Sequence, residues 1–215
     1  MPRSARPAAL RPLTRGLAAA LALCGLVALP AGAWAQNFDT AGVRYEPQLS
    51  LGGSVLQLNG AGIRYKAVFK VYTAGLYLTA KAPTTEAVLA AGGPKRVQVV
   101  MLRDIDANEL GKLFTRGMQD NSPREEFARS IPGTIRLAEI FAAKKKLVAG
   151  DQFSVDWTPG AGTVVRVNGK PMNEPIPEPE FFNGLLRIWL GKSPADHLLK
   201  DALLGKPPTS HQGAG

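Results

Sequence analysis

The segment from Asn59 to Leu78 reads NGAGIRYKAVFKVYTAGLYL, and it decides the fold. A glycine-rich stretch, interpreted as a turn, precedes Arg64, and the residues from Ala67 to Leu78 are rich in Val, Phe, Tyr and Leu. Neither alternate set of side chains in this run is polar enough to face water, so the pattern predicts a β-strand covered on both faces. A cation beside such a strand must be paired or must bind a ligand, which makes Arg64 the first residue to explain.

The rest of the chain predicts an α+β domain. Capping patterns at Asp106 and at Ser122-Pro123 predict helices that begin near Ala107 and at Pro123. Apolar periodicity predicts further helices at 134–146, 179–190 and, more briefly, 85–90, and Ser193 with Pro194 predicts a capped helix at 194–204. Strands are expected at 43–50, 54–58, 64–78, 96–102, 152–158 and 163–168, with a hairpin loop at 159–162. Strands first and helices later favour an open-faced antiparallel sheet with helices packed on one face.

Residues 1–35 have the pattern of a signal peptide. Four arginines with no acidic residue precede an apolar run, Leu17 to Leu29, and Ala33-Trp34-Ala35 is a typical cleavage site before Gln36. The competing interpretation is a retained membrane anchor, but that run is shorter than the roughly 20 residues that span a bilayer. We therefore expect a periplasmic or secreted protein without stable membrane insertion after cleavage. Its expected parts are a signal peptide at 1–35, one domain at 36–205 and a disordered tail at 206–215.

Composition excludes several classes of function. The single cysteine, Cys24, lies in the expected signal peptide, and His197 and His211 are the only histidines, so neither thiol chemistry nor a metal site is expected. No cofactor is predicted, because the glycines at 52, 53, 60 and 62 are too irregularly spaced for a dinucleotide site and are interpreted as turns. Loss of the four leader arginines lowers the net charge from +9 to +5. With Lys144–Lys146 as the only basic run, no nucleic-acid partner is expected.

Three blocks of sequence together resemble the chalcone isomerase-like superfamily. They are N-G-x-G-I-R-x-K followed by F-K-V-Y-x-x-G-L-Y-L, then FFNGLLRIWLG from Phe181, then KSPADHLLKDALLG. The resemblance covers roughly Tyr45 to Gly205 and is strongest to secreted bacterial members. It implies that the first block is the opening β-hairpin of an antiparallel sheet and that the last two blocks are C-terminal helices. We expect the protein to be a monomer.

Arg64 and Tyr72 are the candidate ligand-binding residues. A guanidinium offers a planar fork of donors that matches a carboxylate or an oxyanion, and a tyrosine hydroxyl can add one more hydrogen bond. The resemblance implies that this arginine binds a carboxylate or stabilises an enolate and that Tyr72 carries a hydroxyl in the same pocket. The alternative is structural: Arg64 pairs with an acid such as Asp156, and Tyr72 is a core aromatic residue.

The enzymes of this superfamily place a tyrosine and an asparagine on the helix after the strand that ends at Leu102. Leu110 and Gly117 align with them here, and neither side chain can donate a hydrogen bond. Arg116, on the same helix, is expected to face solvent. The catalytic residues of any enzyme reaction therefore stay unassigned.

Non-catalytic binding of a fatty acid or similar small amphipathic carboxylate is the favoured interpretation. The candidate contacts for its tail are Phe114, Phe127, Phe141, Phe182 and Leu186. One alternative is an intramolecular lyase or isomerase of unknown substrate, in which Arg64 stabilises an enolate. Another is a filled pocket and a protein that acts through its surface.

Overall fold

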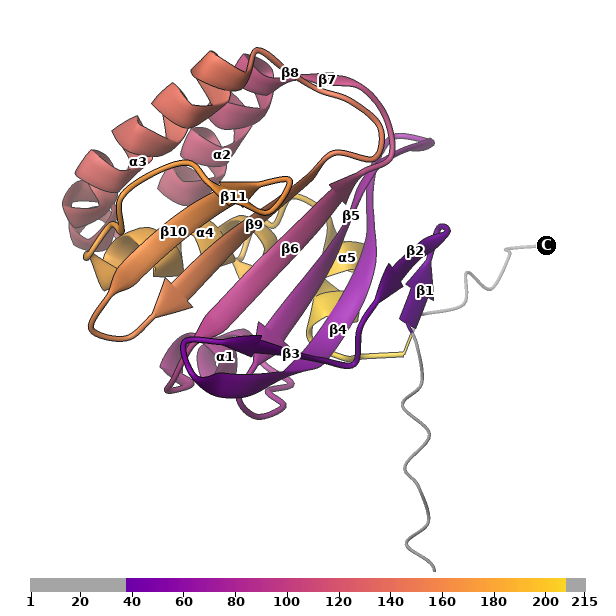
Figure 1. The fold of residues 1–215 in the computed structure, drawn as a ribbon, viewed down its shortest axis with the longest axis horizontal. Helices are drawn as coiled ribbons and strands as arrows, with labels where there is room; N and C mark the ends of the chain where they lie inside the picture. The colour runs from indigo at the N-terminus through magenta and orange to yellow at the C-terminus, as the bar shows by residue number, and fades with distance from the viewer. Residues whose placement is uncertain (1–37, 208–215) are drawn as a thin grey trace, which may run out of the picture. The chain divides into compact units, whose positions relative to one another are not determined.

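The computed structural model describes residues 38–207. A seven-stranded antiparallel sheet has the order β11-β10-β9-β6-β5-β4-β3, and helices lie on one face of it (Figure 1). The strands are β3 (Gln48–Leu51), β4 (Ser54–Lys66), β5 (Phe69–Leu78), β6 (Lys95–Met101), β9 (Gln152–Thr158), β10 (Gly162–Val167) and β11 (Lys170–Pro171). The expected α+β class and the sheet with helices on one face are confirmed.

The remaining elements are two short strand pairs and five helices. The pairs are β1 (Phe38–Thr40) with β2 (Val43–Tyr45), and β7 (Ile105–Asp106) with β8 (Lys146–Leu147). The helices are α1 (Thr85–Ala90), α2 (Ala107–Asn121), α3 (Arg124–Lys144), α4 (Pro179–Leu190) and α5 (His197–Leu203). The expected signal peptide and residues 208–215 of the expected tail lie outside the described residues.

The segment that decides the fold is a hairpin and not one strand from 64 to 78. Strands β4 and β5 are joined at Ala67, whose positive φ of 53° makes the turn, and Arg64 lies opposite Tyr72 in the ladder. The hairpin that the family resemblance implied is confirmed, while the continuous strand predicted from composition is wrong. Apolar content alone cannot locate a tight turn in which Ala67 and Val68 replace the usual Gly or Asn. Residues 71–78 are buried, as expected.

Gly60 and Gly62 were predicted to form a turn, and this was wrong. Both lie inside β4, and helix α5 packs directly on them: a Cβ at Gly60 would lie 1.9 Å from the carbonyl oxygen of Ala202. A glycine inside a strand often marks such a close approach of another backbone. The buried Asn59 amide secures the contact, because it donates to the carbonyls of Ala82 and Leu203 and accepts from the Ala82 amide. Gly52 and Gly53 do form a turn, with positive φ.

Two helix boundaries differ from the predicted ones. Helix α3 runs without a break through Pro132, so the separate helix expected at 134–146 is the second half of a longer one, and Ile135 is exposed. Directly after Pro132, Gly133 packs closely on Phe181 of α4, since a Cβ there would lie 2.5 Å from the ring. Ser122 ends α2 and does not cap α3.

The last helix begins three residues later than expected. Asp196 caps it, with its carboxylate accepting from the amides of Leu198 and Leu199, whereas Ser193 was the predicted cap. An aspartate has the same capping chemistry as a serine, so the capping pattern alone did not discriminate between the two.

The close approach of α5 to β4 predicts a strong position-specific effect. Gly60→Ala should destabilise the protein by about 1–3 kcal/mol or more, because the added methyl group overlaps the Ala202 carbonyl. Gly92→Ala is the matched control, since a Cβ there has no neighbour within 4 Å. Urea denaturation followed by circular dichroism measures both variants, and equal stabilities would contradict the close contact.

Candidate functional site

A cavity of about 230 Å³ lies between the β4–β5 hairpin and helices α2 and α4. Most of its wall is apolar, and the polar groups gather on a few side chains. Its lining residues are Arg64, Lys66, Val71, Tyr72, Ile105, Leu110, Leu113, Phe114, Arg116, Gly117, Asp120, Ile188, Ser193 and Ala195. The two predicted site residues, Arg64 and Tyr72, are therefore brought together in one cavity. An apolar cavity with a few convergent polar groups is the usual form of a small-molecule site.

Arg64 makes only a weak ion pair within the described residues. Its side chain is 24% exposed, and its ion pair with Asp196 is long, with 3.8 Å between Nη1 and Oδ2. Among the described residues this is the only ion pair that Arg64 makes. The guanidinium therefore keeps most of its donors available at the cavity.

Asp196 is the residue that holds this corner of the site. One carboxylate oxygen caps α5, and the other accepts from the Tyr65 amide at 2.9 Å, so the carboxylate is hydrogen-bonded without Arg64. Asp196 thereby ties α5 to the end of β4 next to Arg64. Sequence reasoning missed it, although an aspartate directly before the apolar run of a helix is a recognisable cap signal.

The predicted pairing of Arg64 with Asp156 is wrong. The Asp156 carboxylate accepts hydrogen bonds from Arg96 at 2.6 Å and from Arg166 at 3.0 Å. All three residues are cross-strand neighbours on β6, β9 and β10, whereas Arg64 lies on β4 at the far end of the hairpin.

Tyr72 is a buried aromatic residue with its hydroxyl group at the cavity. The indole Nε1 of Trp189 donates to that hydroxyl at 3.0 Å. Burial raises the pKa of Tyr72 to about 12, while the Trp189 hydrogen bond and the charge of Arg64 offset part of the rise. The hydroxyl therefore keeps its proton at neutral pH. Among the described residues it accepts from Trp189 and has no acceptor for its own proton, so the proton is free to be donated to a ligand.

The other charged groups at the cavity leave it electropositive. Arg116 is exposed, as predicted, and pairs with Asp120 at 3.6 Å one turn along α2. Lys66 is exposed at the rim, and the salt bridges within residues 38–207 do not include it. Arg64 and Lys66 together thus favour an anionic ligand.

Most of the residues predicted to contact a ligand tail instead fill the core. Phe114 does line the cavity, but Phe141 packs edge-on against it, 5.7 Å between ring centroids, and Phe182 stacks on Trp157. Phe127 and Leu186 also lie outside the lining. The helical period placed these side chains on inward faces but could not tell a packed core from a cavity wall. Leu110 and Gly117, which align with catalytic donors of the enzymes, do line the cavity.

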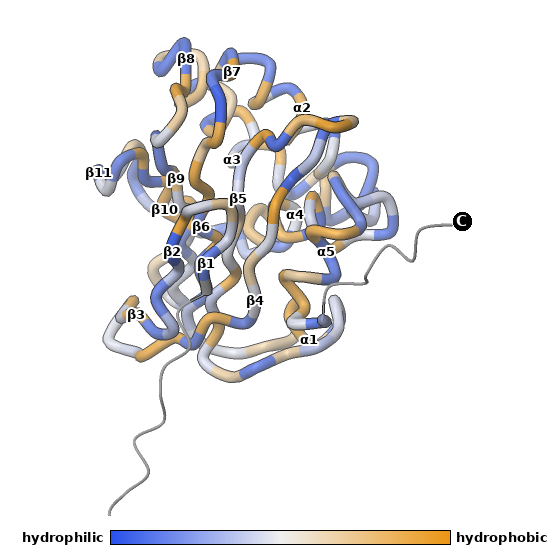
Figure 2. The backbone as a smooth tube through the Cα atoms, turned by 90° about the vertical axis from the view of Figure 1, so that its right-hand side faces the viewer, coloured by the Kyte–Doolittle hydropathy of each residue, from blue (hydrophilic) through white to orange (hydrophobic). Residues whose placement is uncertain are grey.

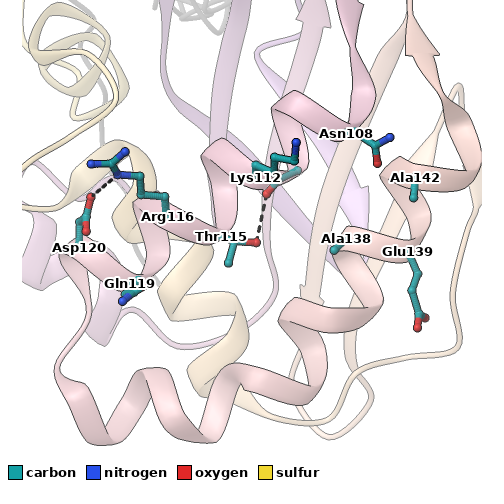
Figure 3. A pocket seen from close by; sticks show the side chains of 10 residues that line it. Asn108, Lys112, Thr115, Arg116, Gln119, Asp120, Ala138, Glu139 and Ala142 are labelled. Carbon is teal, nitrogen blue, oxygen red and sulfur yellow. Dashed lines mark hydrogen bonds and ion pairs between the residues drawn. The ribbon is translucent and has the colours of Figure 1, made fainter.

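A larger hollow, about 840 Å³, lies between the outer sides of α2 and α3 (Figure 3). It is a solvent-facing groove with charged residues on its edges, among them Lys112, Arg116 and Glu139. Figure 3 shows the side chains of Arg116 and Asp120 paired with each other at one end. The groove offers no buried polar group to a ligand, so the smaller cavity is the better candidate.

Three further features of the described residues bear on function. No cluster of three potential metal ligands occurs among residues 38–207. Within the same range, none of the helices combines the length and apolar character needed to cross a bilayer. His197 is exposed on α5.

The fold is that of a chalcone isomerase-like protein. The family model described as chalcone isomerase-like matches residues 37–205, which is most of the chain. The protein therefore belongs to the chalcone isomerase-like family, and the resemblance seen in the sequence is confirmed.

A solved structure with the same fold is the crystal structure of a fatty-acid binding protein from Arabidopsis thaliana. The two chains are 13% identical and superpose with a TM-score of 0.57 over 76% of this chain and 92% of the other. No curated protein sequence matches this chain. At this sequence identity the likeness establishes the fold alone, and it does not identify a ligand or site residues.

The raised pKa of Tyr72 predicts how stability depends on pH. In the unfolded chain a tyrosine loses its proton near pH 10, whereas folded Tyr72 keeps it up to about 12. The folded state thus holds more protons between these values, and the free energy of unfolding falls as pH rises from 10 to 12. At pH 8, Tyr72→Phe should lower the free energy of unfolding by about 1–3 kcal/mol, because the indole N–H of Trp189 loses its acceptor.

The difference in free energy of unfolding between the wild type and Tyr72→Phe should shrink by about 1.4 kcal/mol between pH 8 and pH 11. The wild type loses this stability as Tyr72 titrates, whereas phenylalanine does not titrate. Urea denaturation of both proteins across this range provides the measurement. A deficit that stays constant with pH would mean that the Tyr72 hydroxyl is not shielded from water as described.

Proposed function

We propose that this protein is a non-catalytic binding protein for a fatty acid or a similar amphipathic carboxylate. The observation that carries the proposal is the pairing of an uncommitted guanidinium with a protonated tyrosine hydroxyl in one apolar cavity. A carboxylate is the ligand that uses both groups at once.

The head group would bind at the β4–β5 end of the cavity. Arg64 can offer two parallel N–H groups to the two carboxylate oxygens, the geometry in which arginine binds such groups most strongly. The hydroxyl of Tyr72 could donate its proton to the same carboxylate, since among the described residues it only accepts, from Trp189. Lys66 adds positive charge at the rim.

The apolar tail would lie along Leu110, Phe114 and Ile188, which form the opposite wall. The cavity of about 230 Å³ is smaller than the roughly 300–1,000 Å³ of typical ligand pockets. A long acyl chain would therefore extend past the rim, or the helices would move apart to admit it. Short and medium chains fit the cavity with less rearrangement.

The alternative of an isomerase or lyase has less support from the cavity. Leu110 and Gly117 line it and offer no hydrogen bond, so an enolate would be stabilised by Arg64 and Tyr72 alone. Each missing donor of that kind costs on the order of 10²–10³ in rate. Binding needs none of these additional groups.

Two further observations support the proposal as a whole. The similar Arabidopsis structure is named a fatty-acid binding protein. The N-terminal 35 residues carry the signal-peptide pattern, and the family match begins at residue 37, directly after the expected cleavage site. We therefore propose that the protein is exported and binds its ligand in the periplasm or the secreted fraction.

Replacement of Arg64 tests the head-group contact. Arg64→Ala should weaken binding of a fluorescent fatty acid by about 10- to 150-fold, the equivalent of the roughly 1.5–3 kcal/mol of a charge-assisted hydrogen bond. Arg64→Lys should recover only part of the affinity, since an ammonium cannot make the bidentate contact. Arg129→Ala, which removes a surface arginine paired with Glu180, is the matched control and should bind as the wild type does.

The stability of Arg64→Ala separates the two roles of this residue. Its ion pair with Asp196 is long and partly exposed, so the loss in unfolding free energy should stay below about 1 kcal/mol. Unchanged ligand affinity, or a variant that fails to fold, would favour a structural role for Arg64 and contradict the proposal.

A further inference from the structure

The turn between β4 and β5 exposes apolar side chains that the core does not use. Val68 is 83% exposed and Phe69 is 58% exposed. Val148, in the loop between β8 and β9, is also exposed and lies at the same end of the sheet, because β6 ends and β9 begins beside the start of β5. Figure 1 shows the β4–β5 turn at the same end as β7 and β8, and in Figure 2 the turn is hydrophobic.

Basic side chains surround these apolar residues. Lys66, Lys70 and Arg103 are exposed there, and the ion pairs within residues 38–207 involve none of them. The guanidinium of Arg103 lies 5.1 Å from the ring centroid of Phe69, so the exposed ring carries a cation on its face. The nearest acidic residue in sequence, Asp104, is already paired with Lys146 at 2.7 Å.

We infer that this end of the molecule, the Val68–Phe69 turn with Lys66, Lys70 and Arg103, docks on the surface of a lipid bilayer that contains anionic lipids. Apolar side chains on a protruding turn can enter the interface between headgroups and acyl chains. The unpaired cations complement the negative charge of anionic headgroups. A protein partner fits less well, because lysine is depleted in protein–protein interfaces, whereas Lys66 and Lys70 flank these apolar residues.

Lys66 links this surface to the cavity, since it belongs to both. Docking would therefore bring the cavity rim to the bilayer, where an amphipathic carboxylate is concentrated. The docking inference goes beyond ligand binding and does not depend on it, because the turn and its cations are present whether or not the cavity holds a ligand.

Co-sedimentation of the mature chain, residues 36–215, with vesicles tests the inference. The wild type should sediment with vesicles of phosphatidylcholine containing phosphatidylglycerol and much less with phosphatidylcholine alone, and high salt should weaken the binding. The double variant Val68→Ser/Phe69→Ser should bind at least about tenfold more weakly. Lys70→Glu should lose about fivefold or more, since it removes one surface cation and adds a negative charge.

Two control variants match the changes in kind and exposure. Val55→Ser replaces a residue that is 58% exposed on β4, at the end of the strand away from the turn. Lys170→Glu reverses the charge of an exposed side chain on β11. Both should sediment as the wild type does. Circular dichroism of each variant checks that the fold is intact.

The inference is overturned if the wild type does not sediment with anionic vesicles, if it binds neutral vesicles equally well, or if the Val68→Ser/Phe69→Ser variant binds as the wild type does. A fatty-acid titration in the absence of vesicles, on the same proteins, keeps this result apart from the proposed function. Vesicle binding without fatty-acid binding would support the docking surface and contradict the proposed ligand binding. Fatty-acid binding without vesicle binding would support the proposed ligand binding and contradict the docking surface.

Discussion

The direct contact of helix α5 with strand β4 is the constraint on which the rest of the site depends. Gly60 and Gly62 have no Cβ, so the helix backbone can lie on the strand, and the Asn59 amide bonds to the end of that helix. This contact places the helix cap, Asp196, against the end of the same strand, where it accepts from the Tyr65 amide and lies near Arg64. The position of Asp196 beside Arg64 thus depends on the absence of a Cβ at Gly60 and Gly62.

The charge balance around Asp196 explains why Arg64 is available to a ligand. Three backbone amides already donate to the Asp196 carboxylate. Nη1 of Arg64 therefore lies 3.8 Å from Oδ2 of Asp196 without a close bidentate contact. A guanidinium in a close bidentate pair, like that of Arg96 with Asp156, would have to break strong hydrogen bonds before it could bind an anion. Tyr72 is available in a similar way. Among the described residues its hydroxyl oxygen accepts a hydrogen bond from Trp189, and its own proton has no acceptor.

The sequence was sufficient for the fold class and for the helix starts at Ala107 and Pro179, because periodicity and capping are local signals. The placement of Arg64 and Tyr72 in one pocket was implied by the family resemblance, and the structure brings both residues to one cavity. What the sequence could not supply depends on contacts between distant segments. Gly60 and Gly62 resemble turn residues until helix α5 lies on them, and Pro132 resembles a helix break until the packing of Gly133 on Phe181 is known. Phe141 and Phe182 were assigned to the cavity wall for the same reason, since only packing separates a filled core from a cavity wall.

The ionisation of a bound fatty acid tests the central claim most directly, namely that an uncommitted guanidinium in this cavity binds a carboxylate. A fatty acid labelled with carbon-13 at its carboxyl group can be titrated by NMR while bound to the protein. We predict that the pKa of the bound carboxyl lies well below that of the free acid in the wild type and rises in Arg64→Ala, because a nearby opposite charge favours the ionised form. A bound carboxyl whose pKa equals or exceeds that of the free acid in both proteins would contradict the account.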